Sequence, residues 1–277
     1  MATIPGPLLL VGGGRMGEAL LGGWLRQGLA SGSATVIEPD PGRAAALTAQ
    51  GLAVVPSAAD LPPGFRARIL VLAVKPQVMA DVLPALPGHL APGGLVLSIA
   101  AGKPLAVFEA AFGAVTPIVR VMPNTPAAIG RGISALFANP ATDAANRALA
   151  ERLMQAVGET LWLDAEAEMH AVTALSGGGP AYVCLLVEAL AAAGERLGLA
   201  PELAMRLARA TVAGSGALLE SSDATAAALR EAVTSPGGTT RAALDVLMPA
   251  DGGTEAGLSG LVGEALVRAA ERSRQLA

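Results

Sequence analysis

The chain has 277 residues, enough for one or two domains, and carries a net charge of −4. It has no basic tract and its isoelectric point is near 5.3, which argues against a nucleic-acid-binding protein. Hydrophobic residues make up 52%, but prolines and glycines interrupt the longest uncharged stretches, including GGGP at residues 177–180, which argues against a membrane span. We expect a cytoplasmic protein, because no basic region precedes the first apolar run and the single cysteine, Cys184, permits no intrachain disulfide.

The stretch Leu8–Gly17 reads LLLVGGGRMG and joins a short apolar run to glycines with the spacing Gly-x-Gly-x-x-Gly. A helical pattern follows at residues 18–27, so the order is strand, glycine-rich turn and helix, which a dinucleotide-binding site requires. Gly12 permits the tight turn, Gly14 lets the backbone approach a pyrophosphate, and Gly17 lets the helix pack close to the strand. Free N–H groups at the start of the helix would bind the phosphates. A glycine turn without a ligand is the alternative interpretation.

Short apolar runs then alternate with helical patterns up to residue 164. Such alternation predicts a parallel sheet with helices on both faces, a Rossmann-type doubly wound α/β domain of residues 1–164. Beyond the first run, the predicted strands are Thr35–Glu38, Leu52–Val55, Ile69–Val74, Leu95–Ile99, Pro117–Val121, Ile133–Phe137 and Thr160–Leu163, and the helices between them include Gly42–Gln50 and Leu105–Ala111.

Residues 165–277 have a different pattern, which is rich in alanine and leucine and contains no evident strand. Because few polar residues can cover these helices, we expect their apolar faces to pack against a second copy of the chain. A helical cap on the sheet of a monomer is the alternative. The predicted helices of this all-helical second domain are Ala181–Leu197, Pro201–Glu220, Ala224–Val233, Thr240–Leu247 and Thr254–Gln275.

Glu38 ends the second predicted strand, where an acidic residue typically binds the adenosine ribose hydroxyls. Its charge would repel the 2′-phosphate of NADP(H), and Asp40 would add to that repulsion, while Arg43 could partly offset both. The sequence therefore favours NADH over NADPH. The alternatives are NADPH and a solvated loop carboxylate that binds no cofactor.

Other candidate cofactor residues lie at the carboxyl ends of predicted strands, which line the ligand crevice of such a sheet. Lys75, in Val74-Lys75-Pro76, could contact a phosphate or ribose, or be an exposed loop lysine. The small residues of Ala100-Ala101-Gly102 and the asparagine of Met122-Pro123-Asn124 suit a nicotinamide ring and its carboxamide. The predicted cofactor site comprises Gly12, Gly14, Arg15, Met16, Gly17, Glu38, Val74, Lys75, Pro76, Ala101 and Asn124.

Two glycine-rich segments precede helices in the second half of the chain. SPGGTT, at Ser235–Thr240, places glycines and hydroxyls at a helix N-terminus, which favours an anion such as a substrate carboxylate. The alternative is a turn capped by Ser235 or Thr239. SGGGPAY, at Ser176–Tyr182, can be interpreted as a helix start with Pro180 in the first helical position.

Several catalytic devices of dehydrogenases are missing from the sequence. Leu186, rather than a lysine, stands four residues after the only tyrosine, Tyr182, and no lysine follows SGGGPAY to act as general acid or base. His170 has no evident partner, and no metal-ligand cluster is present, so no metal is predicted. A hydride-transfer enzyme of this kind should not need a strong base. Reduction of a C=N bond fits, because a protonated imine is already electrophilic and needs only an orienting hydrogen bond.

In their order and spacing, these motifs resemble those of the pyrroline-5-carboxylate reductases, over nearly the whole chain. The chain departs from that family's pattern at Gly178, where a serine is usual, and at residues 223–225 (DAT), where a His-Pro pair is common. Besides the first glycine turn, the resemblance rests on AVKP at Ala73–Pro76, SIAAG at Ser98–Gly102, MPNTPA at Met122–Ala127, SGGGPAY at Ser176–Tyr182 and SPGGTT at Ser235–Thr240.

The resemblance implies reduction of Δ1-pyrroline-5-carboxylate to L-proline with NADH or NADPH, the last step of proline biosynthesis. It also implies a homodimer with interleaved helical domains, assembled in some members into a larger ring such as a decamer. Backbone N–H groups of Gly238, Thr239 and Thr240 would bind the substrate carboxylate, and the Thr240 hydroxyl would orient or protonate the ring nitrogen. The substrate site implied in this way comprises Glu166, Ser235, Gly238, Thr239 and Thr240.

Other functions are compatible with parts of the sequence. A hydroxyacid dehydrogenase of similar layout would oxidise small hydroxyacids, but it would need the missing lysine. A non-catalytic dinucleotide sensor would bind the cofactor without turnover, but it would have no use for the SPGGTT turn. A structural helical oligomer would leave the Gly12–Gly17 turn unexplained.

Overall fold

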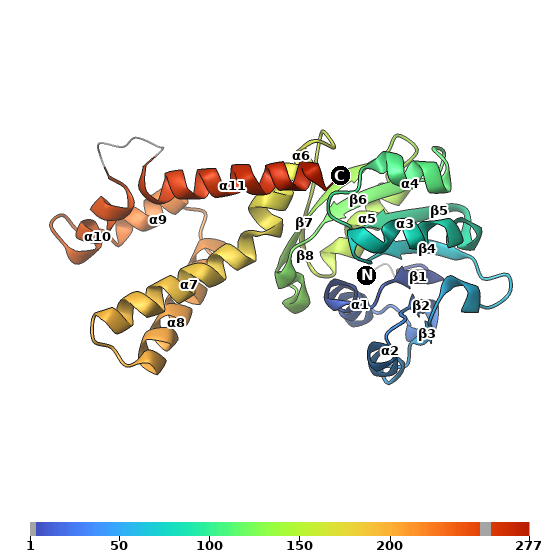
Figure 1. Cartoon of the computed structure of the whole chain (residues 1–277), viewed down its shortest axis with the longest axis horizontal. Coiled ribbons are helices and arrows are strands. Elements are labelled where there is room, and N and C mark those ends of the chain that lie inside the picture. Colours follow the sequence, from blue (N-terminus) through green and yellow to red (C-terminus); the bar gives the residue numbers. More distant parts are fainter. Residues whose placement is uncertain (1–3, 250–255, 277) are drawn as a thin grey trace. The chain divides into compact units, whose positions relative to one another are not determined.

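The computed structural model describes residues 4–249 and 256–276. Its first half contains one eight-stranded sheet with the strand order β3-β2-β1-β4-β5-β6-β7-β8 (Figure 1). Each predicted strand overlaps one of these eight, and the predicted Rossmann-type architecture is confirmed. The strands are β1 (Leu8–Val11), β2 (Ala34–Ile37), β3 (Ala53–Val55), β4 (Ala67–Leu72), β5 (Leu90–Ser98), β6 (Ile118–Met122), β7 (Gly132–Ala138) and β8 (Gly158–Trp162).

Helices cover both faces of the sheet and enclose two hydrophobic cores. Because side chains alternate along a strand, Leu8 and Leu10 of β1 enter one core while Leu9 and Val11 enter the other. The first core lies under α1, α2 and α5, and the second under α3 and α4. The bounds of these helices are α1 (Arg15–Arg26), α2 (Pro41–Thr48), α3 (Met79–Val82), α4 (Leu105–Phe112) and α5 (Ala144–Gln155).

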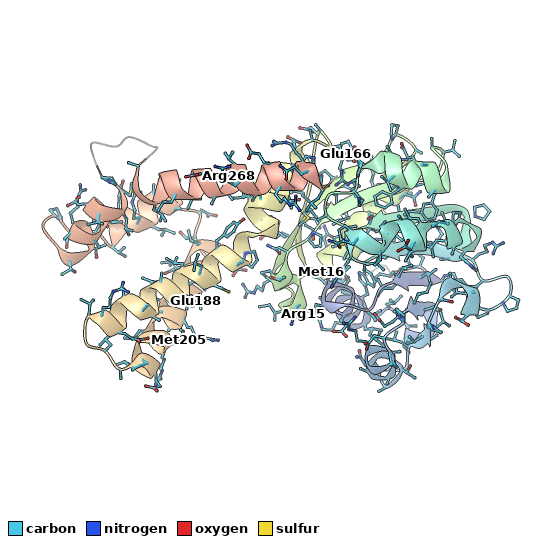
Figure 2. The ribbon with its side chains drawn as sticks, in the orientation of Figure 1. Arg15, Met16, Glu166, Glu188, Met205 and Arg268 are labelled. Atoms are coloured by element: carbon cyan, nitrogen blue, oxygen red, sulfur yellow. The ribbon has the colours of Figure 1, made fainter. Side chains whose placement is uncertain are left out.

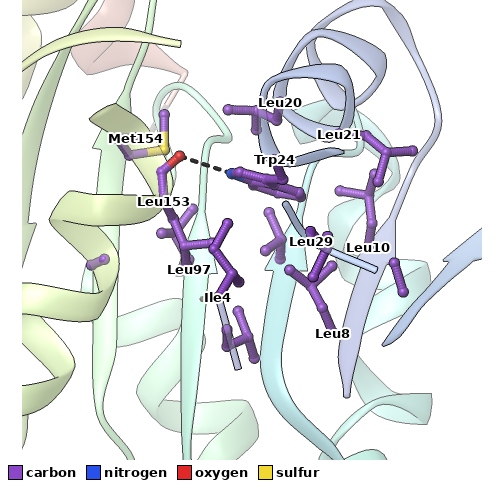
Figure 3. Close-up of a cluster of buried hydrophobic side chains, with 14 of the residues drawn as sticks. Ile4, Leu8, Leu10, Leu20, Leu21, Trp24, Leu29, Leu97, Leu153 and Met154 are labelled. Atoms are coloured by element: carbon purple, nitrogen blue, oxygen red, sulfur yellow. Dashed lines mark hydrogen bonds between the residues drawn. The ribbon is translucent and has the colours of Figure 1, made fainter. Parts of the chain in front are cut away.

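Trp24 is the largest side chain of the first core and fixes α1 in place (Figure 3). Its indole Nε1–H donates a hydrogen bond of 2.8 Å to the carbonyl oxygen of Leu153 in α5. The indole has a single donor, which would be costly to bury unpaired. Since α1 follows directly from the glycine turn, this contact also fixes the start of the helix relative to the sheet.

The sheet is not wholly parallel, so the prediction of a parallel sheet is wrong at one edge. The strands from β3 to β6 are parallel, but β7 pairs antiparallel with β6 and parallel with β8. Only a short helical turn, Thr125–Ile129, joins β6 to β7. A parallel connection needs a crossover of a dozen residues or more, so this short link reverses the chain.

The described residues form two compact units, one of residues 4–177 with 270–276 and one of residues 178–249 with 256–269. The first unit includes α6 (Glu168–Val172) and the end of α11 (Gly257–Gln275). In this unit the Oγ atom of Ser273 lies 2.9 Å from Nδ1 of His170. Residues 165–177 thus group with the sheet, whereas the predicted domain boundary lies after residue 164.

The second unit consists of helices, without a strand among its described residues. Its apolar surface is incompletely covered: Leu185 is 63% exposed on α7 and Leu261 is 70% exposed on α11. The predicted helices are confirmed, although Thr254, the expected start of the last one, lies outside the described residues. Besides most of α11, the unit contains α7 (Gly179–Arg196), α8 (Pro201–Glu220), α9 (Ala226–Ala232) and α10 (Thr239–Leu247).

One helical segment, residues 168–196, is long and apolar enough to cross a membrane, judged by length and composition alone. It runs from α6 through a π-helical turn at Thr173–Gly177 into α7. The predicted interruption is present as a bend at Gly178, between the π-helical turn and α7. The prediction that SGGGPAY starts a helix is confirmed, because α7 begins at Gly179 with Pro180 in its first turn, where its missing N–H is not needed.

Candidate active site

A pocket of about 650 Å³ lies in the first unit, at the carboxyl ends of β1, β4, β5 and β6. This edge of a doubly wound sheet is where ligands bind. The glycine turn, the start of α1 and the loops after β4, β5 and β6 all contribute to it. Its lining residues are Gly14, Arg15, Met16, Glu18, Arg43, Ala73, Val74, Lys75, Pro76, Ile99, Ala100, Ala101, Met122, Pro123, Asn124, Thr125 and Gly177.

The glycine turn has the geometry of a phosphate cradle. Gly12 has a φ of +101°, which favours glycine, and a Cβ at Gly17 would overlap the carbonyl oxygen of Gly12. A Cβ at Gly14 would meet no atom within 4 Å, so this residue opens toward the pocket. Gly14 is also the N-cap of α1, and no side chain caps the helix, so its first N–H groups are available to an anion.

Cationic side chains surround this cradle. Arg15, at the start of α1 (Figure 2), and Lys75, after β4, line the pocket and form no ion pair with another described residue. Arg43 also lines it, and its Nη1 lies 3.8 Å from Oε1 of Glu38. The free helix amides and these cations fit a ligand with a pyrophosphate group, so the residues present suit a dinucleotide.

Glu38 lies behind the pocket lining and is 4% exposed. Its Oε2 accepts a hydrogen bond from the N–H of Gly13, and its Oε1 accepts one from the N–H of Asp40, both at 2.9 Å. The carboxylate therefore ties the glycine turn to the end of β2 and places a negative charge beside the turn.

The other side of the pocket is formed by the loops after β5 and β6. Ala101 supplies a small side chain, and Asn124 is fixed because its Oδ1 accepts a hydrogen bond of 3.0 Å from the N–H of Ile133. The Asn124 amide N–H groups remain available to a ligand. A Cβ at Gly177 would overlap the terminal methyl of Met122, so only glycine fits at this position without displacing the methionine.

Glu166 does not line the pocket. Its Oε1 accepts hydrogen bonds of 2.6 Å from Nη1 of Arg120 and from the N–H of Leu105. The nearby His170 has its pKa lowered, chiefly by burial and then by the charges of Arg120 and Arg274, which outweigh the opposite effect of Glu166. His170 is therefore neutral at pH 7, which fits its hydrogen bond with Ser273 rather than a catalytic role.

The SPGGTT turn lies in the second unit, before α10. Gly237 has a φ of +68°, and Gly238 is the N-cap without any side-chain cap. The capped-turn alternative is thus wrong. The first amide to bond within the helix is that of Ala242, which donates to Gly238 at 3.2 Å. The N–H groups of Thr239 and Thr240 therefore face no acceptor among the described residues, as an anion site requires.

The pocket unites most of the predicted cofactor residues, while Gly12, Gly17 and Glu38 support it from behind. Five further lining residues, Glu18, Ala73, Ile99, Thr125 and Gly177, had no role predicted from the sequence. All of them except Glu18 lie within the motifs AVKP, SIAAG, MPNTPA and SGGGPAY, so these motifs contained the signal. No group of residues suited to a metal ion occurs in the described part of the chain. The lining residues predicted from the sequence are Gly14, Arg15, Met16, Val74, Lys75, Pro76, Ala101 and Asn124.

Comparison with protein-family models identifies two matching regions. Residues 166–276 match the model described as pyrroline-5-carboxylate reductase dimerisation, and residues 8–102 match that described as NADP oxidoreductase, coenzyme F420-dependent. Among curated proteins, the pyrroline-5-carboxylate reductase of Pseudomonas aeruginosa is 42% identical over 271 residues, which cover 98% of this chain and 96% of that protein. The Mycobacterium tuberculosis reductase is 39% identical, over 97% of this chain and 96% of that protein.

Solved structures agree with these matches. A pyrroline-5-carboxylate reductase from Coxiella burnetii has a TM-score of 0.88 and 33% identity, covering 98% of both chains. The Plasmodium falciparum enzyme, solved with NADP bound, has a TM-score of 0.83 and 28% identity, covering 99% of both chains. The similarity therefore includes both the sheet and the helical half of the chain.

Proposed function

This chain belongs to the pyrroline-5-carboxylate reductase family, and on that premise we propose how its residues share the work of catalysis. It reduces Δ1-pyrroline-5-carboxylate to L-proline with a nicotinamide cofactor, the final step of proline biosynthesis. The proposal concerns the residues that bind the cofactor and substrate, the choice of cofactor, and the assembly. The pocket at the carboxyl ends of the strands is the observation that carries it.

We place the pyrophosphate of the cofactor at the glycine turn, against the N–H groups of α1 and beside Arg15. Lys75 would contact phosphate or ribose. The nicotinamide would lie between Val74, Ala101 and Asn124, with its carboxamide on the Asn124 side chain. When bound, the reduced cofactor supplies the hydride to the carbon of the C=N bond. These residues hold its ring and exclude water, so their contribution is orientation.

The turn at Ser235–Thr240 would bind the substrate. Its carboxylate would accept hydrogen bonds from the N–H groups of Thr239 and Thr240, and the Thr240 hydroxyl would orient or protonate the ring nitrogen. The N–H of Gly238 already donates to the carbonyl oxygen of Ser235 at 3.1 Å, so it would contact the carboxylate only as a shared donor. We retain Glu166 as a residue on the substrate side of the site, through its Oε2, because only its Oε1 accepts hydrogen bonds from the described residues.

The function can be tested by steady-state reduction of pyrroline-5-carboxylate with each cofactor. We expect turnover with NADH and NADPH and no oxidation of small hydroxyacids. Tight cofactor binding without any turnover would contradict the reductase function and favour a dinucleotide sensor. Turnover with hydroxyacids would instead indicate a dehydrogenase.

We propose that NADH is preferred, because the Glu38 carboxylate stands beside the glycine turn and would repel a 2′-phosphate. Glu38→Gln keeps the length of the side chain and removes the charge, and it also loses one of the two backbone N–H bonds, so the affinity for both cofactors should fall and the ratio between them is the readout. It should raise the ratio of kcat/KM for NADPH to that for NADH about tenfold, since a close like-charge pair costs at least 1–2 kcal/mol. Asp40→Ser is the control, because it removes a more exposed charge and leaves a good helix N-cap, so the ratio should change less.

A preference for NADPH would contradict this cofactor proposal. If the wild-type enzyme prefers NADPH and Arg43→Ala abolishes that preference, the guanidinium that lines the pocket determines the choice, and Glu38 only holds the turn. Fluorescence titration with both reduced cofactors would show whether the difference lies in binding.

The dimerisation region supports a homo-oligomer. We propose a cytoplasmic homodimer with interleaved helical units, able to form a larger ring, in which the helical unit of one chain brings its Thr240 to the cofactor of its partner. Light scattering after size exclusion should give at least twice the chain mass of 27.4 kDa. Leu261→Glu, at a 70% exposed position of α11, should lower that mass, whereas Val115→Glu, at a 90% exposed position in the other unit, should not. A monomeric wild-type protein would contradict this assembly.

A further inference from the structure

Several segments that line one side of the pocket converge on a single carboxylate oxygen. Oε1 of Glu166 accepts hydrogen bonds from Nη1 of Arg120 and from the N–H of Leu105, both at 2.6 Å. Arg120 belongs to β6, and Leu105 begins α4. Glu166, which is labelled in Figure 2, lies between β8 and α6. One atom thus joins elements that are 46 and 61 residues from Glu166 in the sequence.

Each of these elements continues into the pocket lining. Two residues after Arg120 the chain reaches Met122–Thr125, and the loop before Leu105 contains Ile99–Ala101. The segment after Glu166 leads through α6 to Gly177, which packs against Met122. One shared contact therefore links the elements that lead into these wall segments.

The burial of Arg120 makes the loss of this contact costly. The Arg120 side chain is 8% exposed and that of Glu166 is 31% exposed. A buried guanidinium that loses its carboxylate leaves an uncompensated charge, so the surrounding segments would have to move to admit water. α4 has Pro104 as its N-cap and no cap from its own sequence, so the Glu166 carboxylate takes that role at the positive end of the helix.

We infer that Arg120 is a positioning residue for hydride transfer, which fixes the nicotinamide half of the pocket through Glu166. This inference rests on the proposed use of the pocket. Arg120 is not among the lining residues, so it acts through the loops after β5 and β6. The other half of the pocket, with Gly14, Arg15 and Arg43, is built from segments that do not meet at Glu166. Loss of the ion pair should therefore weaken the binding of the nicotinamide end of the cofactor and leave the binding of its ADP-ribose end unchanged.

The test compares wild type with Arg120→Met, Arg120→Lys and Glu166→Gln by calorimetric titration with NADH and with ADP-ribose. Arg120→Met and Glu166→Gln should lower the affinity for NADH about tenfold and leave the affinity for ADP-ribose within about twofold of wild type. Their kcat should fall at least tenfold. Arg120→Lys should restore part of the loss, because it keeps the charge but not the planar donor geometry. Arg68→Met is the matched control. It removes an arginine that donates to Gly93 and Asn146 at the amino end of β4, and it should leave both affinities unchanged.

Equal weakening of NADH and ADP-ribose would overturn the inference, because it would indicate general damage to the unit. Wild-type affinity for NADH in Arg120→Met and Glu166→Gln would overturn it as well. Neither result would affect the proposed function, as long as the wild-type enzyme binds NADH and reduces pyrroline-5-carboxylate. A wild type that bound neither NADH nor ADP-ribose would refute the use of this pocket itself.

Discussion

Replacing Thr240 by alanine should lower the kcat for pyrroline-5-carboxylate about 100-fold or more while NADH binds as tightly as in wild type. Thr240 is exposed in the first turn of α10, and its hydroxyl forms no hydrogen bond with another described residue, so it is free to meet a ligand. A donor or acid that acts on the reacting nitrogen contributes about 10²–10³ in rate. The backbone N–H of residue 240 survives the substitution, so the carboxylate contacts should persist and KM should change little.

Thr240→Ser is the informative companion variant, because it keeps the hydroxyl and removes only the methyl group. Its kcat should lie within about tenfold of wild type. Because the helix starts at an uncapped glycine, neither substitution removes a cap. If Thr240→Ala raised KM and left kcat unchanged, the hydroxyl would bind the substrate equally in the ground and transition states and would not act on the nitrogen.

The fold was largely predictable from the sequence because its strands are short apolar runs bounded by glycine or polar residues, and each run enters a core. The direction of β7 was not, since it depends on the short link Thr125–Ile129 rather than on the strand itself. Glycine and proline at Gly177–Pro180 correctly predict a helix start, since Gly178 is the N-cap of α7 and Pro180 lies in its first turn. The π-helical turn at Thr173–Gly177, which leads from α6 to this start, has no local signal in the sequence.

In the site, too, residues placed by a local motif were predictable, whereas contacts between distant elements were not. Gly14 and Lys75 were predictable because a local motif, or the carboxyl end of a strand, places them at the pocket. The sequence assigned Glu38 to the ribose, but it has no local sign that its carboxylate also holds the N–H of Gly13. Nor does it show that Arg120 and Glu166 meet, because the two residues lie in separate elements, 46 positions apart. Contacts between distant elements are set by packing, which no short pattern encodes.

The glycine turn allows folding and cofactor binding to be separated with two single substitutions. Gly17→Ala should destabilise the protein by about 2–3 kcal/mol and abolish measurable NADH binding, because its Cβ would overlap the carbonyl oxygen of Gly12. That oxygen belongs to the backbone at a φ of +101°, so it has little freedom to move away. Chemical denaturation and fluorescence titration would measure the two effects.

Gly14→Ala should behave differently, although it lies only three residues away. A Cβ there meets no protein atom within 4 Å, and the φ of −73° suits any residue, so the free energy of unfolding should stay within about 0.5 kcal/mol of wild type. The new methyl group would stand where the pyrophosphate approaches the backbone, so NADH affinity should fall at least tenfold. Wild-type affinity in Gly14→Ala would show that the cofactor does not approach this backbone. Loss of stability in both variants would mean that the turn serves the fold rather than the cofactor.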